Sequence, residues 1–191
     1  MTEIDFSVFD YNVVVPDVGL ARYINLKPIF TPHSAGKHAN KFLGKSNVNV
    51  LERLTNNLMR GGPMKGGAFT GKKTKAQRAV FEALRAVEVR TKENPLQMFV
   101  NAIANAAPIE EVVRLVYAGI SVPRAVDISP QRRVDLALRN IAIAAMKASH
   151  KNKKPIHDCL ADEITLASKN SINSKAVSRK DEIERVAQSA R

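Results

Sequence analysis

The sequence has few aromatic residues, a single cysteine and no long apolar run. Aromatic residues make up 5% of the 191 residues and tryptophan is absent, so a hydrophobic core has to be mainly aliphatic. One cysteine, Cys159, excludes an internal disulfide framework and a metal site built from cysteines alone. No apolar stretch approaches the roughly 18 residues of a membrane span, and the acidic start MTEIDFSVFD does not resemble a signal peptide. These absences favour a soluble protein of a reducing compartment.

The charge of the chain is strongly positive and unevenly placed. Thirty Lys and Arg against 18 Asp and Glu give a formal net charge of +12 on a chain that is 45% hydrophobic, which is ordinary for a globular protein. Residues 37–92 hold 13 basic and 3 acidic residues, a net charge of +10. A surface that serves solubility alone intersperses both signs. The concentration of one sign therefore predicts a surface for a polyanion, most often nucleic acid.

Within this basic segment, one stretch holds no acidic residue between Glu52 and Glu82. The cations that it offers to a polyanion are Arg53, Arg60, Lys65, Lys72, Lys73, Lys75 and Arg78.

The spacing of apolar residues predicts a mainly α fold. We expect a single bundle of about six helices with a protruding β-hairpin and an extended basic N-terminal arm. Residues 1–45 are assigned to an N-terminal extension, with a strand over 6–15, and to the basic arm. Residues 46–191 form the helical domain, in which the β-branched segment at about 111–128 predicts the hairpin.

Polar residues before apolar runs predict where several helices begin. Thr74 with Gln77 matches a capping box, and Asn94 and Ser129 each precede a proline, a pattern typical of a helix start. A last short helix is expected from Ser178 to residue 187, where a cap and charged residues come first.

The segment GGAFTGKKT partly matches a phosphate-binding loop through Gly66, Gly71 and Lys72. Lys73 stands where a Ser or Thr would hold magnesium, and the segment follows a helix where that motif follows a buried strand. We therefore do not predict a nucleotide site. Glycines still let a backbone approach phosphates closely, which suits a nucleic-acid backbone.

Metal and catalytic chemistry find little support in the sequence. The histidines have no metal-like spacing to Cys159 or to a carboxylate pair, and we expect no metal site and no cofactor. His150 and His157 are expected at helix ends. Cys159 lies on an apolar helix face, which favours a buried structural thiol.

Four arginines surround the predicted hairpin. Arg114 and Arg124 lie on its two arms, where a β-ribbon could enter a groove or follow a single strand of nucleic acid. An ordinary hairpin packed on helices, with Val112, Arg114 and Val116 on one face, fits the sequence as well. Arg132 and Arg133 begin the following helix and oppose its dipole, a cost that a nearby phosphate would relieve.

Several segments together resemble universal family seven of the small-subunit ribosomal proteins. They are VLERLTNNLMR, GKKTKAQRAVFEAL, ENPLQMFVNAIANAAP, AVDISPQRRVDLALRNI, CLADEI and the ending SRKDEIERVAQSAR. The chain resembles the archaeal branch, with the eukaryotic small-subunit protein five as a relative. The bacterial branch has a Gly-Gly hairpin tip where this chain has Ala118-Gly119.

This resemblance implies a non-catalytic structural protein of the cytoplasmic ribosome. It implies binding to the 3′ major (head) domain of small-subunit rRNA, nucleation of head assembly, and a hairpin near the exit-site tRNA, the mRNA path and the protein of universal family eleven. Carried over by position, it places on rRNA the cations Lys37, Lys41, Lys45, Lys72, Lys73, Lys75, Arg78, Arg132 and Arg133. It gives Arg114, Tyr117 and Arg124 as hairpin residues near the exit site.

Two other functions remain open at this point. A free-standing helical chaperone of RNA or DNA would share the salt-sensitive binding but not a single defined RNA site. An enzyme is third, because no general acid or base stands out in the sequence.

Overall fold

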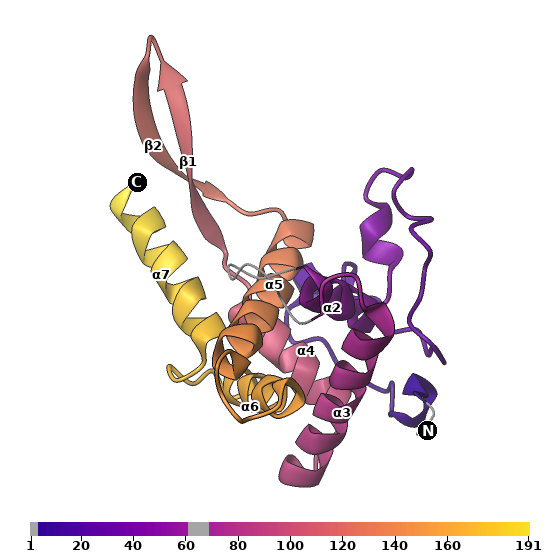
Figure 1. The fold of residues 1–191 in the computed structure, drawn as a ribbon. Helices are drawn as coiled ribbons and strands as arrows, with labels where there is room; N and C mark the ends of the chain where they lie inside the picture. The colour runs from indigo at the N-terminus through magenta and orange to yellow at the C-terminus, as the bar shows by residue number, and fades with distance from the viewer. Residues whose placement is uncertain (1–3, 61–68) are drawn as a thin grey trace.

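A computed structural model describes residues 4–60 and 69–191, and helices dominate this part of the chain (Figure 1). The elements described are η1 (Phe6–Val8), α1 (Val18–Ala21), η2 (Gly44–Asn47), α2 (Val50–Met59), α3 (Lys73–Thr91), α4 (Pro95–Ala106), β1 (Glu110–Tyr117), β2 (Ile120–Asp127), α5 (Pro130–Ser149), α6 (Ile156–Ser168) and α7 (Lys175–Ser189). The prediction of a mainly α fold with a β-hairpin is confirmed.

The core lies where α6 packs against α3, α4 and α5, and α2 closes it against α3 and α5. Its side chains are mostly aliphatic, and fully buried examples from five helices are Leu54, Leu84, Ile103, Leu138 and Ile164. Each of these residues lies on the buried face of its helix. Among the described residues, no helix is long and apolar enough to cross a membrane.

The predicted strand at residues 6–15 is wrong. This segment begins with the 3-10 helix η1, in which Asp5 accepts a hydrogen bond from the Ser7 amide at 2.8 Å. The rings of Phe6 and Phe9 each lie 5.5 Å from the ring of Phe81 on α3. The β-propensity of this segment is a weak preference when no neighbouring strand pairs with it. The burial of its aromatic rings against α3 is the stronger effect, and it sets the conformation.

Two predicted helix starts also differ in the structure. Helix α3 begins at Lys73, one residue before Thr74, and its N-cap residue Lys72 has no side-chain acceptor to cap it. The predicted capping box is therefore wrong, and Gln77 donates to the carbonyl of Pro32 at 2.9 Å. Helix α7 begins at Lys175, capped by Ser174, three residues before the predicted start. The predicted cap at Asn94 is confirmed, since its side chain accepts from the Leu96 amide at 2.9 Å.

The hairpin projects beyond the helices (Figure 1), and in the part of the chain that the structure describes its hydrogen bonds to other elements lie near its base. Its two-residue turn places Ala118 at φ 47° and Gly119 at φ 83°, the left-handed pair that matches the twist of a hairpin. At the base, the Ile109 amide donates to Glu184 of α7 at 2.9 Å, and the Ala125 amide donates to the carbonyl of Ala190 at 3.4 Å. Helix α7 therefore fixes the direction in which the hairpin projects.

Candidate nucleic-acid interface

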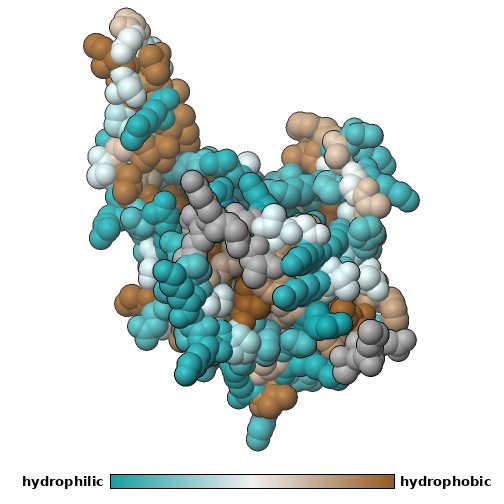
Figure 2. Space-filling model, viewed as in Figure 1, coloured by the Kyte–Doolittle hydropathy of each residue, from teal (hydrophilic) through white to brown (hydrophobic). Residues whose placement is uncertain are grey.

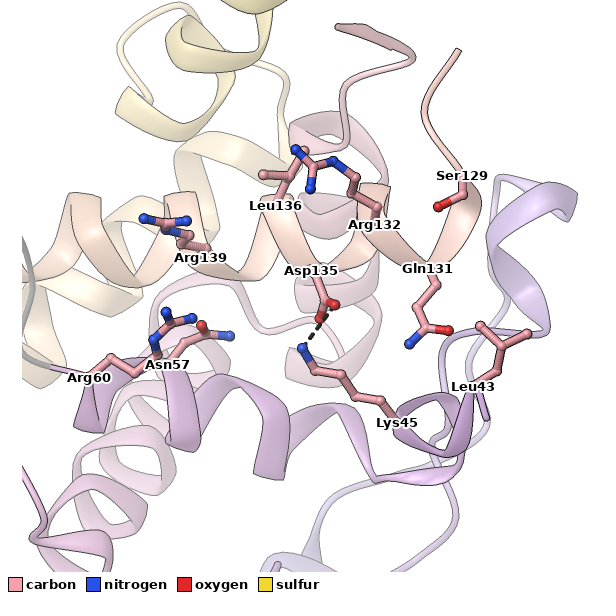
Figure 3. A pocket seen from close by; sticks show the side chains of 10 residues that line it. All are labelled: Leu43, Lys45, Asn57, Arg60, Ser129, Gln131, Arg132, Asp135, Leu136 and Arg139. Carbon is pink, nitrogen blue, oxygen red and sulfur yellow. Dashed lines mark hydrogen bonds and ion pairs between the residues drawn. The ribbon is translucent and has the colours of Figure 1, made fainter. Parts of the chain in front are cut away.

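Two projections flank a hydrophilic surface on one side of the molecule. One is the hairpin, and the other is the arm, which we define as residues 32–47 (Figures 1 and 2). The arm is built from successive tight turns and η2. We call the surface between these projections the saddle; its floor includes the first half of α5 and the end of α2 (Figures 1 and 3).

A hollow of about 360 Å³ opens in this floor between the arm, α2 and α5 (Figure 3). Its lining residues are Leu43, Lys45, Asn57, Arg60, Ser129, Gln131, Arg132, Asp135, Leu136 and Arg139. Four of them are cations and one is an acid, so the hollow carries a formal excess of positive charge. Such an excess around a concave site attracts anions.

The one acid in the hollow, Asp135, is already neutralised by cations of the protein. Its Oδ2 accepts from Lys45 Nζ at 2.8 Å, and its Oδ1 accepts from Arg53 Nη2 at 2.9 Å. The Arg53 side chain is 2% exposed and also donates to the carbonyl of Tyr23 at 2.8 Å. Asp135 therefore ties the arm and α2 to α5.

Two other cations of the hollow are available to a ligand. Arg60 and Arg139 are exposed, and neither has an ion-pair partner within residues 4–60 and 69–191. Arg139 is absent from the predicted contact residues. Its spacing from Arg132 and Asp135 along α5 is seven and four residues, so all three share one helix face. That helical spacing could have identified Arg139 from the sequence.

The two arginines at the start of α5 have carboxylate partners inside the protein. Arg132 Nε lies 2.7 Å from Glu111 Oε1 on β1, and Arg133 Nη2 lies 2.9 Å from Asp17 Oδ2. These carboxylates offset the repulsion between the two arginines and the helix dipole. The sequence analysis expected a phosphate to do so. The hydrogen bond to Glu111 raises the pKa of Arg132, which keeps its charge and is 57% exposed in its side chain.

A second internal pair lies at the start of α3. Lys73 Nζ donates to Glu52 Oε1 at 2.7 Å, and the Ser34 amide donates to the same oxygen at 2.9 Å. Burial alone would raise the pKa of Glu52, but the hydrogen bonds from Lys73 and Ser34 outweigh burial and lower that pKa. The cluster joins the arm, α2 and α3, and it neutralises Lys73.

The structure separates the predicted rRNA contacts into groups. Those that are exposed and lack an ion-pair partner in the described part of the chain are Lys37, Lys41, Arg60, Lys72 and Arg78. Those paired with a carboxylate are Lys45, Lys73, Arg132 and Arg133.

Three predicted contacts fall outside these groups. The Lys75 ammonium lies 5.6 Å from the centre of the Phe69 ring, and Lys65 lies outside the described residues. Arg53 has to be removed from the predicted contacts, because its buried guanidinium holds Asp135 and cannot meet a large ligand. A charge count cannot detect such burial.

The hairpin presents one arginine on each of its faces. The register pairs Arg114 with Pro123 and Val113 with Arg124, and directly opposite residues share a face. Arg114 thus lies on the face of Val112 and Val116, as the sequence predicts, while Arg124 lies on the other face. Both arginines are exposed, and neither has an ion-pair partner among the described residues.

The predicted histidine and cysteine positions can be compared with the described part of the chain. Within residues 4–60 and 69–191, no group of three His, Cys, Asp or Glu side chains is arranged to hold a metal ion. Cys159 is buried on α6 as predicted, and burial raises the pKa of its thiol. His150 ends α5 and His157 lies in the first turn of α6, which confirms their predicted places.

Comparisons with known proteins point in one direction. A family model described as ribosomal protein S7p/S5e matches residues 20–191. The chain is 55% identical over 179 residues to the small ribosomal subunit protein uS7 of Picrophilus torridus, covering 94% of this chain and 93% of that protein. It is 52% identical over 187 residues to uS7 of Thermoplasma volcanium, covering 97% and 99%, and 51% identical over 187 residues to uS7 of Archaeoglobus fulgidus, covering 97% and 94%.

Proposed function

The chain belongs to the ribosomal protein S7p/S5e family, and from that membership we propose a specific role for it on the small ribosomal subunit. Members of this family are structural constituents of the small subunit and not enzymes. We propose that the chain binds the 3′ major (head) domain of small-subunit rRNA and nucleates assembly of the head. In this proposal the hairpin reaches toward the exit-site tRNA and the mRNA path.

The observation that carries the proposal is the charge balance of the saddle. Four cations from the arm, α2 and α5 surround one carboxylate, and that carboxylate is already bound to Lys45 and to the buried Arg53. The exposed guanidiniums of Arg60 and Arg139 therefore remain for external anions. A folded RNA presents a dense row of phosphates to such a surface, and neutralising them releases condensed counterions.

The internal ion pairs give this surface a fixed geometry. Lys45–Asp135 joins the arm to α5, and Lys73–Glu52 joins α3 to α2 beside the arm. Contacts to phosphates position a protein on RNA through shape, which requires cations at fixed distances from one another. A cationic surface that the fold assembles from the arm, α2, α3 and α5 supports one defined RNA site over the sliding contacts of a general chaperone.

The hairpin supports a second contact region. Its tip carries Tyr117, which is 60% exposed, and its two faces carry Arg114 and Arg124 separately. A ribbon with a cation on each face can contact RNA on both sides. Val113 and Val122, two exposed apolar residues on the same face of the hairpin, offer a surface to a protein neighbour, for which we propose the protein of universal family eleven.

The proposal is tested by measuring binding to a head-domain rRNA fragment across a salt series. If roughly 6–10 phosphates are neutralised, affinity should fall ~10³–10⁵-fold between 50 and 200 mM salt. Arg139→Glu should weaken binding and make the slope of log affinity against log salt shallower by about one or more. Lys153→Glu is the control, since it makes the same charge change in the loop between α5 and α6.

Two results would contradict the proposal. Equal loss of affinity in the Arg139→Glu and Lys153→Glu variants would mean that net charge matters and the saddle does not. Equal affinity for the head fragment and for unrelated RNA of the same length, without co-sedimentation with small subunits, would favour the chaperone.

A further inference from the structure

An almost fully exposed aromatic ring stands in the middle of the basic arm. Phe42 is 94% exposed, more than any other large hydrophobic side chain in the described residues. It follows Lys41 directly and lies three residues before Lys45. Folding gains nothing from an exposed phenyl ring, because no apolar surface is removed from water.

The backbone holds this ring at the corner of a tight turn. The Gly44 amide donates to the carbonyl of Lys41 at 3.0 Å, which leaves Phe42 and Leu43 at the two central positions. Leu43 has a φ of 54°, which is strained for a residue with a side chain. A side chain at Gly44 would bring its Cβ to 2.5 Å from the carbonyl oxygen of His38, so the turn requires glycine there.

The turn stands at the edge of the hollow in the saddle. Leu43 lines the hollow, and the Lys45–Asp135 pair fixes the residues after the turn on α5 (Figure 3). Gln131 also lines the hollow, and its buried Oε1 has no hydrogen-bond partner in the described part of the chain. The turn that carries Phe42 therefore adjoins, through Leu43, a hollow that holds the free cations Arg60 and Arg139.

We propose that the turn at residues 41–44 and the hollow bind an unpaired segment of rRNA, with one base stacked on Phe42. This inference rests on the proposed function and adds the kind of RNA that the saddle selects. Bases inside an A-form duplex cover one another's faces, so a base within a paired stretch has no free face for a side chain, whereas an unpaired base has one. The strand's phosphates lie against the exposed guanidiniums of Arg60 and Arg139.

The surrounding charge favours RNA over a protein segment as the occupant. An apolar peptide could cover Phe42 and Leu43, but it would leave the guanidiniums of the hollow without anions. A single-stranded RNA satisfies both features at once, since grooves for single strands combine cations along the backbone with aromatic stacking platforms.

The absence of tryptophan makes the inference directly measurable. Phe42→Trp creates a single tryptophan emitter in the full-length chain, and Phe30→Trp is the matched control because Phe30 is another exposed ring, 58% exposed. The probes are the head-domain rRNA fragment and a fully paired RNA duplex of equal length. We expect the head fragment to quench the tryptophan emission of the Phe42→Trp variant strongly and the duplex to leave it nearly unchanged. The emission of the Phe30→Trp variant should be insensitive to both.

Affinity gives the second measurement. Phe42→Ala should weaken binding to the head fragment roughly 5- to 150-fold, the effect of losing one stacked base. Phe42→Tyr should restore the affinity, Phe42→Leu should not, and Phe30→Ala should bind as the wild type does. Circular dichroism checks that each variant is folded.

The outcomes separate this inference from the proposed function. If Phe42→Ala binds the head fragment as the wild type does while the salt slope stays steep, the stacked base is wrong and the rRNA interface remains. If the emission of the Phe42→Trp variant responds equally to duplex and head fragment, selection for an unpaired segment is wrong. If the wild type does not prefer the head fragment at all, the proposed function fails and this inference fails with it.

Discussion

Replacing Asp135 by Asn should weaken the fold and strengthen RNA binding at the same time. The change removes the carboxylate partner of Arg53, whose side chain is 2% exposed. Arg53 would keep its hydrogen bond to the Tyr23 carbonyl, while its Nε already lacks a partner in the described residues. The same change removes the only acidic side chain that lines the hollow among those residues.

The size of the stability effect follows from burial. Removing one partner of a buried ion pair costs about 3–5 kcal/mol, because the other charge is left without compensation. The Asp135 side chain is 29% exposed, so water reaches this pair and we expect the lower end, ~3 kcal/mol. Lys45→Met breaks the exposed half of the same cluster and should cost only about 0–1 kcal/mol.

Urea unfolding followed by circular dichroism measures the first effect, and rRNA binding at several salt concentrations measures the second. Asp135→Asn should bind more tightly than the wild type at low salt, and the difference should shrink as salt screens the hollow. A stability loss below about 1 kcal/mol, equal to that of Lys45→Met, would refute the buried-pair reasoning. Weaker RNA binding by the folded variant would refute the charge assignment of the hollow.

Three further predictions concern the ion pairs and the hairpin turn. Lys72→Glu should weaken rRNA binding and change stability by no more than about 0.5 kcal/mol, whereas Lys73→Glu should unfold at lower urea because it sets a second carboxylate against the buried Glu52. The lowered pKa of Glu52 implies a stability contribution that is present above pH 4.5 and lost as pH falls through the folded-state pKa. The melting temperature of the Glu52→Gln variant should therefore fall less steeply than that of the wild type as the pH is lowered below 4.5. Ala118→Gly should relieve a left-handed strain of ~1–2 kcal/mol and slow hydrogen exchange of the hairpin amides, and unchanged exchange would contradict the strain.

Features that depend on residues close together in the chain could be predicted from the sequence. The apolar face of each of the helices α2 to α5 follows from spacing alone, and the helix cap at Asn94 follows from its side chain and the next proline. The hairpin follows from a β-branched run around a two-residue turn. The same reasoning fails for the segment at residues 6–15, because its conformation depends on Phe81, more than 70 residues away in the chain.

For the candidate interface too, some features follow from the sequence and others follow only from the fold. The number of cations, their concentration in residues 37–92 and the apolar faces of the helices can all be read from the order of the residues. Which cations are free depends on the folded arrangement, since Arg53 meets Asp135 across 82 residues and Lys73 meets Glu52 across 21. Charge is a property of each residue, but its availability to a ligand depends on distance to other charges and on burial, and the fold sets both.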